Sequence, residues 1–419
     1  MNRKIAPEIS AINSVELISP QKIDLGNGID LFWMNDVPDK TVKLDMVWNA
    51  GSKFQNKPLV ASFCNQLLLS GNHSISSQSI SEQIDSHGGY ISHSQHKDHA
   101  GLTVFGLTDS IAPIFDIVKS HLLDGAFIDI EVNKLKENRK KEFELSEEKV
   151  SVNARKLFTE SLFGKQHYYG RLAKAEDFDA LLSSDLRAFF KSYYLNTKPT
   201  LFLVGNVSEQ FIDSIRQFVS IFKNTTTKKA IVIPVQKIQN KYKTKSGSVQ
   251  SAIRIGKLCM DKTDSDFVTF QVLNTILGGY FGSRLMANIR EEKGYTYGIG
   301  SGITALKDAT YFYISTEVAV DKREDTIKEI YFEMERLQTE KISENELCVV
   351  KNYMLGSFLR NSDGAISMME KHKSLILQDL SELYYTNYIK GVNSTTAEDL
   401  IKVAKKHFDR NTFSEISFG

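Results

Sequence analysis

The chain contains an internal repeat, because three short blocks of its first half recur in the same order in its second half. The matching pairs lie 205, 208 and 214 residues apart: Gln83–Tyr90 with Asn288–Tyr295, Leu69–Asn72 with Leu277–Tyr280, and Ser184–Tyr194 with Glu398–Phe408. Each match is weak alone, but a constant order with a nearly constant offset is typical of a duplicated unit. The sequence therefore predicts two similar domains.

Length and composition agree with this duplication. With 419 residues and 41% hydrophobic content, the chain suits two domains of roughly 200 residues each. A polar and basic stretch around one short apolar run lies between residues 224 and 247. We therefore expect an N-terminal domain over residues 1–224, a linker over 225–247 and a C-terminal domain over 248–419.

The hydrophobic pattern predicts the elements of each half. Val42–Trp48 alternates as a half-buried strand, and Leu59–Leu69 repeats apolar residues at helical spacing. Tyr90–Leu107 alternates again, as strands of a hairpin. Thr200–Val207 is a short apolar strand that ends at a turn, after which Ser208 can cap a helix. These patterns predict an α+β fold, with two mainly antiparallel sheets covered by helices.

The charge balance argues against some classes of partner. Lys and Arg number 52 and Asp and Glu 51, so no net field favours nucleic acid or an anionic membrane. The first ten residues lack an apolar run and no later stretch approaches 18 apolar residues, so we expect neither a signal peptide nor a membrane span. An odd number of cysteines, three, fits a reducing compartment. We expect a cytoplasmic protein.

One block of the second half is especially distinctive. Leu277–Leu285, LGGYFGSRL, runs into Arg290–Tyr297, REEKGYTY. Together with Leu203–Val207 and His167–Arg171, this block resembles the insulinase-like (M16) metallopeptidase family, which includes the mitochondrial processing peptidases and many bacterial two-domain proteins. The resemblance covers nearly the whole chain and implies two domains of the M16 type.

The same resemblance implies a zinc-binding His-x-x-Glu-His in the first half, and here this chain departs from the family. Ser62, Asn65 and Gln66 fall where the two histidines and the glutamate should be. Neither a hydroxyl nor an amide is a good Zn²⁺ ligand, and none of these groups acts as a base near neutral pH. We expect no metal in this chain.

The resemblance further implies a distant glutamate ligand. Glu144 is the best match for it, Glu137 matches its frequent companion, and Glu142 is a competing alignment. The alternative is that these glutamates are simply solvated, since residues 134–149 form a highly charged segment.

In the second half, by contrast, two residues match the pattern of the family. The resemblance implies that Arg290 and Tyr297, seven residues apart, hold the substrate backbone over the zinc. Arg supplies a fork of donors and Tyr a phenol that can donate to a carbonyl or an oxyanion. The alternative is that Arg290 is a helix-terminal cation and Tyr297 an ordinary strand aromatic.

Three histidines, His93, His96 and His99, suggest a replacement metal site. If they lie on one strand, His93 and His99 share a face about 20 Å apart and His96 points away. We therefore expect surface or cleft-lining histidines here.

These features favour a subunit that is inactive alone. It would supply Arg290 and Tyr297 to a zinc-motif-bearing M16 partner, as a heterodimer acting on peptides, with the zinc held by the partner. The alternative is a metal-free peptide-binding or structural scaffold protein of the same family, and a homodimer remains open.

Overall fold

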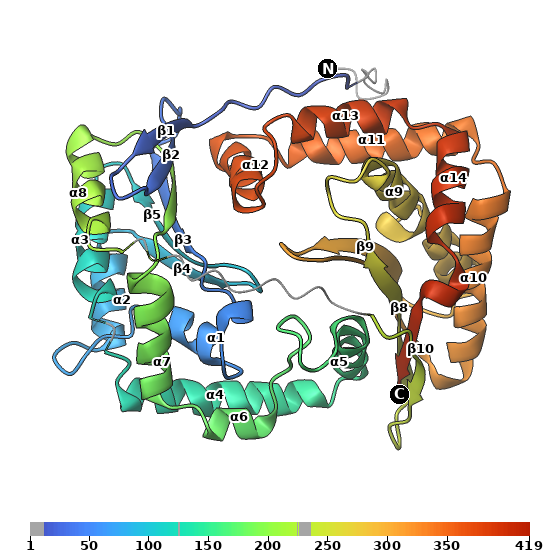
Figure 1. Ribbon diagram of the computed structural model, residues 1–419, viewed down its shortest axis with the longest axis horizontal. Coiled ribbons are helices and arrows are strands. Elements are labelled where there is room, and N and C mark those ends of the chain that lie inside the picture. The colour runs from blue at the N-terminus through green and yellow to red at the C-terminus, as the bar shows by residue number, and fades with distance from the viewer. Residues whose placement is uncertain (1–11, 125, 224, 226–235) are drawn as a thin grey trace, which may run out of the picture.

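The computed structural model describes residues 12–124, 126–223, 225 and 236–419, and two β-sheets form its framework (Figure 1). The first sheet has six strands, in the spatial order β1 (Gln21–Asp24), β2 (Asp30–Met34), β6 (Thr200–Val204), β3 (Thr41–Trp48), β5 (Ala100–Leu107) and β4 (Tyr90–Gln95). The second has five, in the order β7 (Asn240–Lys243), β11 (Ser414–Phe418), β8 (Gln250–Cys259), β10 (Thr310–Ala319) and β9 (Ile299–Ala305).

The two sheets share one topology, which confirms the duplication expected from the sequence. The order β6-β3-β5-β4 in the first sheet corresponds to β11-β8-β10-β9 in the second, and all of these neighbours are antiparallel. In each sheet the last strand of the half also pairs in parallel with an earlier strand, β2 or β7. The α+β class is confirmed. Within the expected linker, residues 226–235 lie outside the described part and Asn240–Lys243 form β7.

Helices of each half cover one face of their own sheet. The helices of the first half are α1 (Val60–Gln66), α2 (Ser77–Ser86), α3 (Ile111–Leu122), α4 (Asp129–Glu147), α5 (Val150–Phe163), α6 (Ala175–Asp179), α7 (Ser183–Phe190) and α8 (Glu209–Val219). Those of the second are α9 (Phe267–Asn274), α10 (Arg323–Thr339), α11 (Glu344–Arg360), α12 (Ala365–Leu377), α13 (Tyr384–Ser394) and α14 (Ala397–His407), with π-helical turns η3 (Thr275–Gly279) and η4 (Met286–Glu292). Local capping agrees with the sequence, since the Ser208 hydroxyl accepts from the Phe211 N–H at the start of α8.

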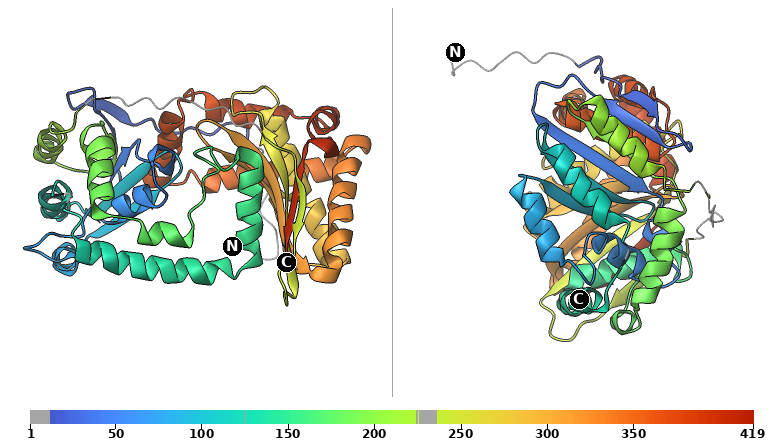
Figure 2. Two further views of the ribbon diagram at one scale, coloured as in Figure 1. Left: turned by 60° about the horizontal axis from the view of Figure 1, so that its bottom comes forward. Right: turned by 90° about the vertical axis from the view of Figure 1, so that its left-hand side faces the viewer.

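The opposite face of each sheet is covered by a helix from the other half. α5 packs on β8 and β11 of the second sheet, where Phe158 and Leu162 join Ile416 in a buried cluster. In return, α12 packs on β6 of the first sheet, where Met369 joins Phe202 in another. Figures 1 and 2 show the route of the first exchange, because α4 extends from the first half to the second and leads into α5. Each sheet is therefore completed by both halves.

The turns of the two equivalent hairpins meet between the sheets. Lys53, in the short helix η1 (Ser52–Phe54), places its Nζ 3.1 Å from Asp98 Oδ1 and 3.0 Å from Asp308 Oδ2. Asp98 lies in the β4–β5 turn and Asp308 in the β9–β10 turn. The side chains are 11%, 9% and 7% exposed, respectively. We call Lys53, Asp98 and Asp308 the central ion cluster.

Further hydrogen bonds complete this cluster. The Tyr168 hydroxyl donates to Asp308 at 2.8 Å, and the Tyr169 hydroxyl donates to Asp98. The backbone N–H of Lys307 donates to the other carboxylate oxygen of Asp98 at 3.0 Å. Because buried charges are stable only when paired and hydrogen-bonded, this cluster fixes the two halves against each other.

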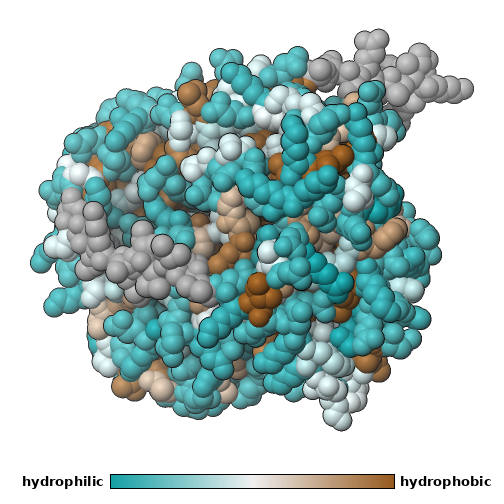
Figure 3. Space-filling view, turned by 45° about the vertical axis from the view of Figure 1, so that its right-hand side comes forward, coloured by the Kyte–Doolittle hydropathy of each residue, from teal (hydrophilic) through white to brown (hydrophobic). Residues whose placement is uncertain are grey.

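The outer surface has no dominant hydrophobic region on the face shown in Figure 3, where hydrophilic residues predominate and hydrophobic ones form small separate areas. Among the described residues, no helix combines the length and apolarity needed to cross a membrane.

Candidate functional site

The segment that aligns with the expected zinc motif lies on α1, and its polar groups are occupied by local contacts. The Ser62 hydroxyl donates to the carbonyl of Leu59 at 2.9 Å. Asn65 is 1% exposed, and its amide nitrogen donates to the Gly101 carbonyl and the Tyr194 hydroxyl, both at 3.2 Å. Asn65 thus makes buried hydrogen bonds within the core and is not placed to contact a substrate.

Gln66, the third motif position, is exposed and contacts α4. Arg139 donates to Gln66 Oε1 through both Nε, at 3.2 Å, and Nη2, at 2.9 Å. Its third contact runs from Nη1 to Glu142 Oε2 at 2.8 Å. A guanidinium therefore lies between the third motif position and a carboxylate of the expected ligand region.

The structure separates the candidate glutamates. Glu142 is linked to Gln66 through Arg139, whereas the exposed Glu144 lines a different pocket of about 890 Å³ beside α5. Glu137 is exposed on α4. Among residues 12–124, 126–223, 225 and 236–419, no group of three His, Cys, Asp or Glu side chains is placed to hold a metal ion. Hydroxyl and amide donors beside a guanidinium do not fit a zinc ion.

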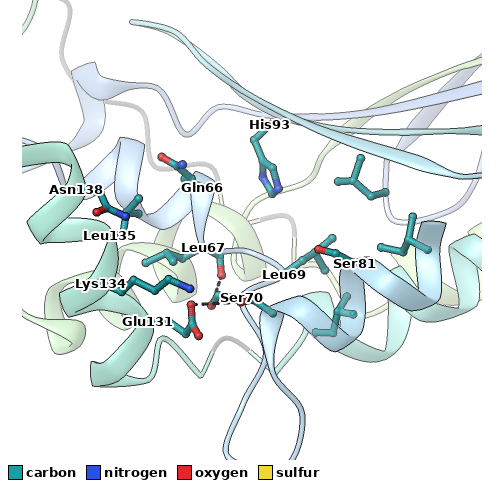
Figure 4. Close-up of a pocket in the computed structure, with 14 residues that line it drawn as sticks. Gln66, Leu67, Leu69, Ser70, Ser81, His93, Glu131, Lys134, Leu135 and Asn138 are labelled. Atoms are coloured by element: carbon teal, nitrogen blue, oxygen red, sulfur yellow. Dashed lines mark hydrogen bonds between the residues drawn. The ribbon is translucent and has the colours of Figure 1, made fainter. Parts of the chain in front are cut away.

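A pocket of about 310 Å³ lies beside Gln66, between α1, α2, α4 and β4 (Figure 4). Its polar lining includes Ser70, His93, Glu131 and Lys134. His93 points into it, and its Nδ1 donates to the Asn65 carbonyl at 2.8 Å, which leaves Nε2 as the acceptor. Burial lowers the pKa of His93, although the hydrogen bond to Asn65 opposes this effect. A neutral imidazole therefore faces the pocket.

The expected single-strand arrangement of the three histidines is wrong. β4 ends at Gln95 and β5 begins at Ala100, so the chain turns between His96 and His99. The His96 N–H donates to the His99 carbonyl at 2.9 Å across this turn. Both line a pocket of about 690 Å³ between the halves, together with Ser62, Lys307 and residues of α12. Burial lowers the pKa of His99 to about 4, so the ring is neutral at pH 7.

Arg290 and Tyr297 are joined directly. Arg290, in η4, donates from Nε to the backbone carbonyl of Tyr297 at 3.0 Å. Its guanidinium also lies 4.7 Å from the ring centre of Phe281, within the range of a cation–π contact. The Tyr297 side chain is 97% exposed. The backbone of this pair is thus fixed, while the phenol is presented at the surface.

Tyr297 and Ser62 line different pockets, near opposite ends of β9. Tyr297 precedes β9 by two residues, and Ala305, at the other end of β9, lines the pocket that contains Ser62. A strand of seven residues spans about 20 Å. Tyr297 instead lines a separate pocket of about 370 Å³ with Arg254 and Glu317.

Comparison with known proteins agrees with this architecture. Residues 32–176 match the model of the insulinase family, peptidase family M16, and residues 182–354 match the model described as the peptidase M16 inactive domain. The chain belongs to the M16 peptidase family.

Individual M16 relatives are distant. The uncharacterized zinc protease YmxG of Bacillus subtilis is 20% identical over 83% of this chain and 85% of its own. The probable inactive metalloprotease YmfF of the same organism is 21% identical over 55% of this chain and 54% of its own. A crystal structure of a peptidase M16 inactive domain from Pseudomonas fluorescens superposes with a TM-score of 0.86 at 21% identity, covering 96% of this chain and 98% of that one. That last likeness shows the fold alone.

Sequence reasoning missed Arg139 and the central ion cluster. For the cluster, a signal was present, because Lys97-Asp98 recurs as Lys307-Asp308 at an offset of 210 residues, within the range of the repeat. For Arg139, nothing in a helix of alternating charges singles out one arginine.

Proposed function

We propose that this M16 chain is the metal-free, substrate-binding subunit of a two-chain zinc peptidase. In this proposal Arg290 and Tyr297 extend to the zinc site of a partner M16 chain that carries an intact His-x-x-Glu-His. The substrate is a peptide, and the chain does not hydrolyse it alone.

The observation that carries the proposal is that the Arg290–Tyr297 pair combines a fixed backbone with an exposed phenol. A contact from Arg290 to the Tyr297 backbone fixes the loop, yet the phenol ring is almost fully exposed. An isolated exposed aromatic needs no explanation by itself. An exposed phenol next to a fixed guanidinium, at the opposite end of β9 from the pocket that contains Ser62, suits a surface that acts on another molecule.

The chemistry available to this pair is binding and charge stabilisation. Among the described residues, the Nη groups of Arg290 come no closer to a carboxylate than 3.8 Å, at Glu291, so they can donate to a substrate carbonyl. The Tyr297 hydroxyl can donate to the oxyanion that forms during peptide hydrolysis. Orientation of the peptide by these two groups would lower the entropic part of the barrier.

The test is peptide cleavage by this chain, by the zinc-motif chain and by their mixture. We expect activity only in the mixture. Tyr297→Phe, which removes only the hydroxyl, should lower kcat by about 10²-fold, the typical cost of one oxyanion donor. Arg290→Lys keeps the charge but loses the fork, and should raise KM. Tyr90→Phe, at another exposed tyrosine (63%), is the matched control and should change neither constant.

Size-exclusion chromatography of the mixture separates loss of docking from loss of chemistry. Stable association without any gain in cleavage would support the scaffold or peptide-binding alternative instead. Cleavage by this chain alone that a chelator abolishes would refute the proposal.

A further inference from the structure

The contact between α1 and α4 at the altered motif is made by a cation. Arg139 has five N–H donors, and three of its hydrogen bonds are directed at two acceptors: two at Gln66 Oε1 and one at Glu142 Oε2. Arg139 and Glu142 lie three residues apart, on one face of α4. The guanidinium is therefore held from both sides, although 46% of the Arg139 side chain is exposed to solvent.

The two acceptors occupy informative positions. Gln66 stands at the third position of the altered motif, where a zinc-bearing relative has its second histidine, and Glu142 is one of the two candidates for the distant carboxylate. A metal ion held by such a pair would bridge α1 and α4. In this chain a guanidinium bridges the same two helices, with an amide oxygen and a carboxylate as its acceptors.

We propose that Arg139 takes the place of the metal, so that it ties α1 to α4 and excludes divalent cations from the altered motif. A divalent ion between residues 66 and 142 would lie at contact distance from the guanidinium, and like charges at that distance repel strongly. Glu142 would also have to leave Arg139 to bind the ion. The loss of metal binding therefore has two parts, absent ligands and a resident cation, and restoring the ligands alone does not restore the site.

The experiment measures zinc binding, not peptidase activity, and so does not depend on the proposed partner. Ser62→His/Gln66→His restores both imidazoles while leaving the buried Asn65 intact. It is compared with the same variant carrying Arg139→Leu, by competition with a chromophoric zinc chelator. We expect one zinc ion per chain, bound at least tenfold more tightly when Arg139 is removed. Lys141→Leu in the same background removes one charge from an exposed position of α4 and should change the Kd less than twofold.

Two further variants identify the carboxylate. In the background without Arg139, Glu142→Gln should weaken zinc binding and Glu144→Gln should not. If Ser62→His disturbs folding, as judged by circular dichroism, Gln66→His with and without Arg139→Leu gives the same comparison at an exposed site, with Cu²⁺ as the probe.

Equal metal affinity with and without Arg139 would overturn the proposal. It would also be overturned by an equal gain from Lys141→Leu, which would show a general charge effect, or by loss of binding with Glu144→Gln but not with Glu142→Gln.

Discussion

Removing the cation of the central ion cluster should destabilise the whole protein. The variant is Lys53→Met, which keeps much of the side chain's apolar length but leaves Asp98 and Asp308 facing each other without their shared charge. Lys53 is 11% exposed and the two carboxylates 9% and 7%, so water cannot replace it efficiently. Breaking a buried ion pair by removing one partner costs about 3–5 kcal/mol. Because Tyr168, Tyr169 and the Lys307 N–H still donate to the carboxylates, we expect the lower end, about 3 kcal/mol.

The assay is urea denaturation followed by circular dichroism, with Lys57→Met as the matched control. Lys57 forms an ion pair with Asp185 at 2.8 Å, but its side chain is 51% exposed, and exposed pairs contribute about 0–1 kcal/mol. A loss in Lys53→Met no larger than that in Lys57→Met would refute the reasoning.

The pH dependence gives a second check on the same cluster. Burial by itself raises the pKa of Asp308, but hydrogen bonds from Tyr168 and Lys53, with the charge of Lys53, outweigh it and hold the pKa below its usual value. The stabilisation is therefore fully present above the unfolded pKa of about 3.9. It is lost as pH falls through the lower folded value, so the difference between wild type and Lys53→Met should narrow below about pH 4.

Two other predictions concern a partly buried histidine and a close backbone contact. Burial lowers the pKa of His99 to about 4, against about 6.5 in the unfolded chain. The unfolded chain therefore binds more protons between these pH values, and His99 lowers the free energy of unfolding by up to about 3 kcal/mol as pH falls from 7 to 4. His99→Gln should reduce the shift in urea midpoint between pH 7 and pH 4.5, and an unchanged shift would contradict this. In Gly256→Ala the new Cβ would lie 2.2 Å from the Phe312 carbonyl oxygen and 2.7 Å from Phe158 Cζ on α5, so strain should lower the free energy of unfolding by about 1–3 kcal/mol. Gly356→Ala, where nothing lies within 4 Å of the new Cβ, is the matched control and should be neutral or slightly stabilising. Thermal melts of both variants test this, and an equal loss of stability in Gly256→Ala and Gly356→Ala would rule out the packing argument.

The repeated order of strands could be predicted from sequence, because turn and helix signals recur at nearly constant offsets and the alternation of Val42–Trp48 and Tyr90–Leu107 fixes their strands. The packing of α5 and α12 on the sheet of the other half could not be predicted. An amphipathic pattern shows that a helix buries one face, but not which sheet it covers. The turn between His96 and His99 also gave a weak signal, since it contains neither Gly nor Pro.

At the candidate site, the alternative reading of Tyr297 as an ordinary strand residue is wrong, because Tyr297 lies in the loop between η4 and β9. Sequence reasoning preferred Glu144 to Glu142 as the distant carboxylate, whereas Arg139 links Glu142 to Gln66; both glutamates occur on one charged helix, and only the facing element distinguishes them. The role of Arg139 could not be predicted for the same reason, because it depends on a contact with Gln66, which is 73 residues away in the chain.

The exchange of helices also sets the order in which the protein can finish folding during synthesis. Strands β1 to β6 are complete once Val204 has been made. The hydrophobic face that includes Phe202 and Val204 is nevertheless covered by Met369 and its neighbours on α12, and Met369 is synthesised 165 residues after Val204. A nascent chain therefore carries one finished sheet with an uncovered hydrophobic face until α12 has been made, and a chaperone would have most to protect during this interval.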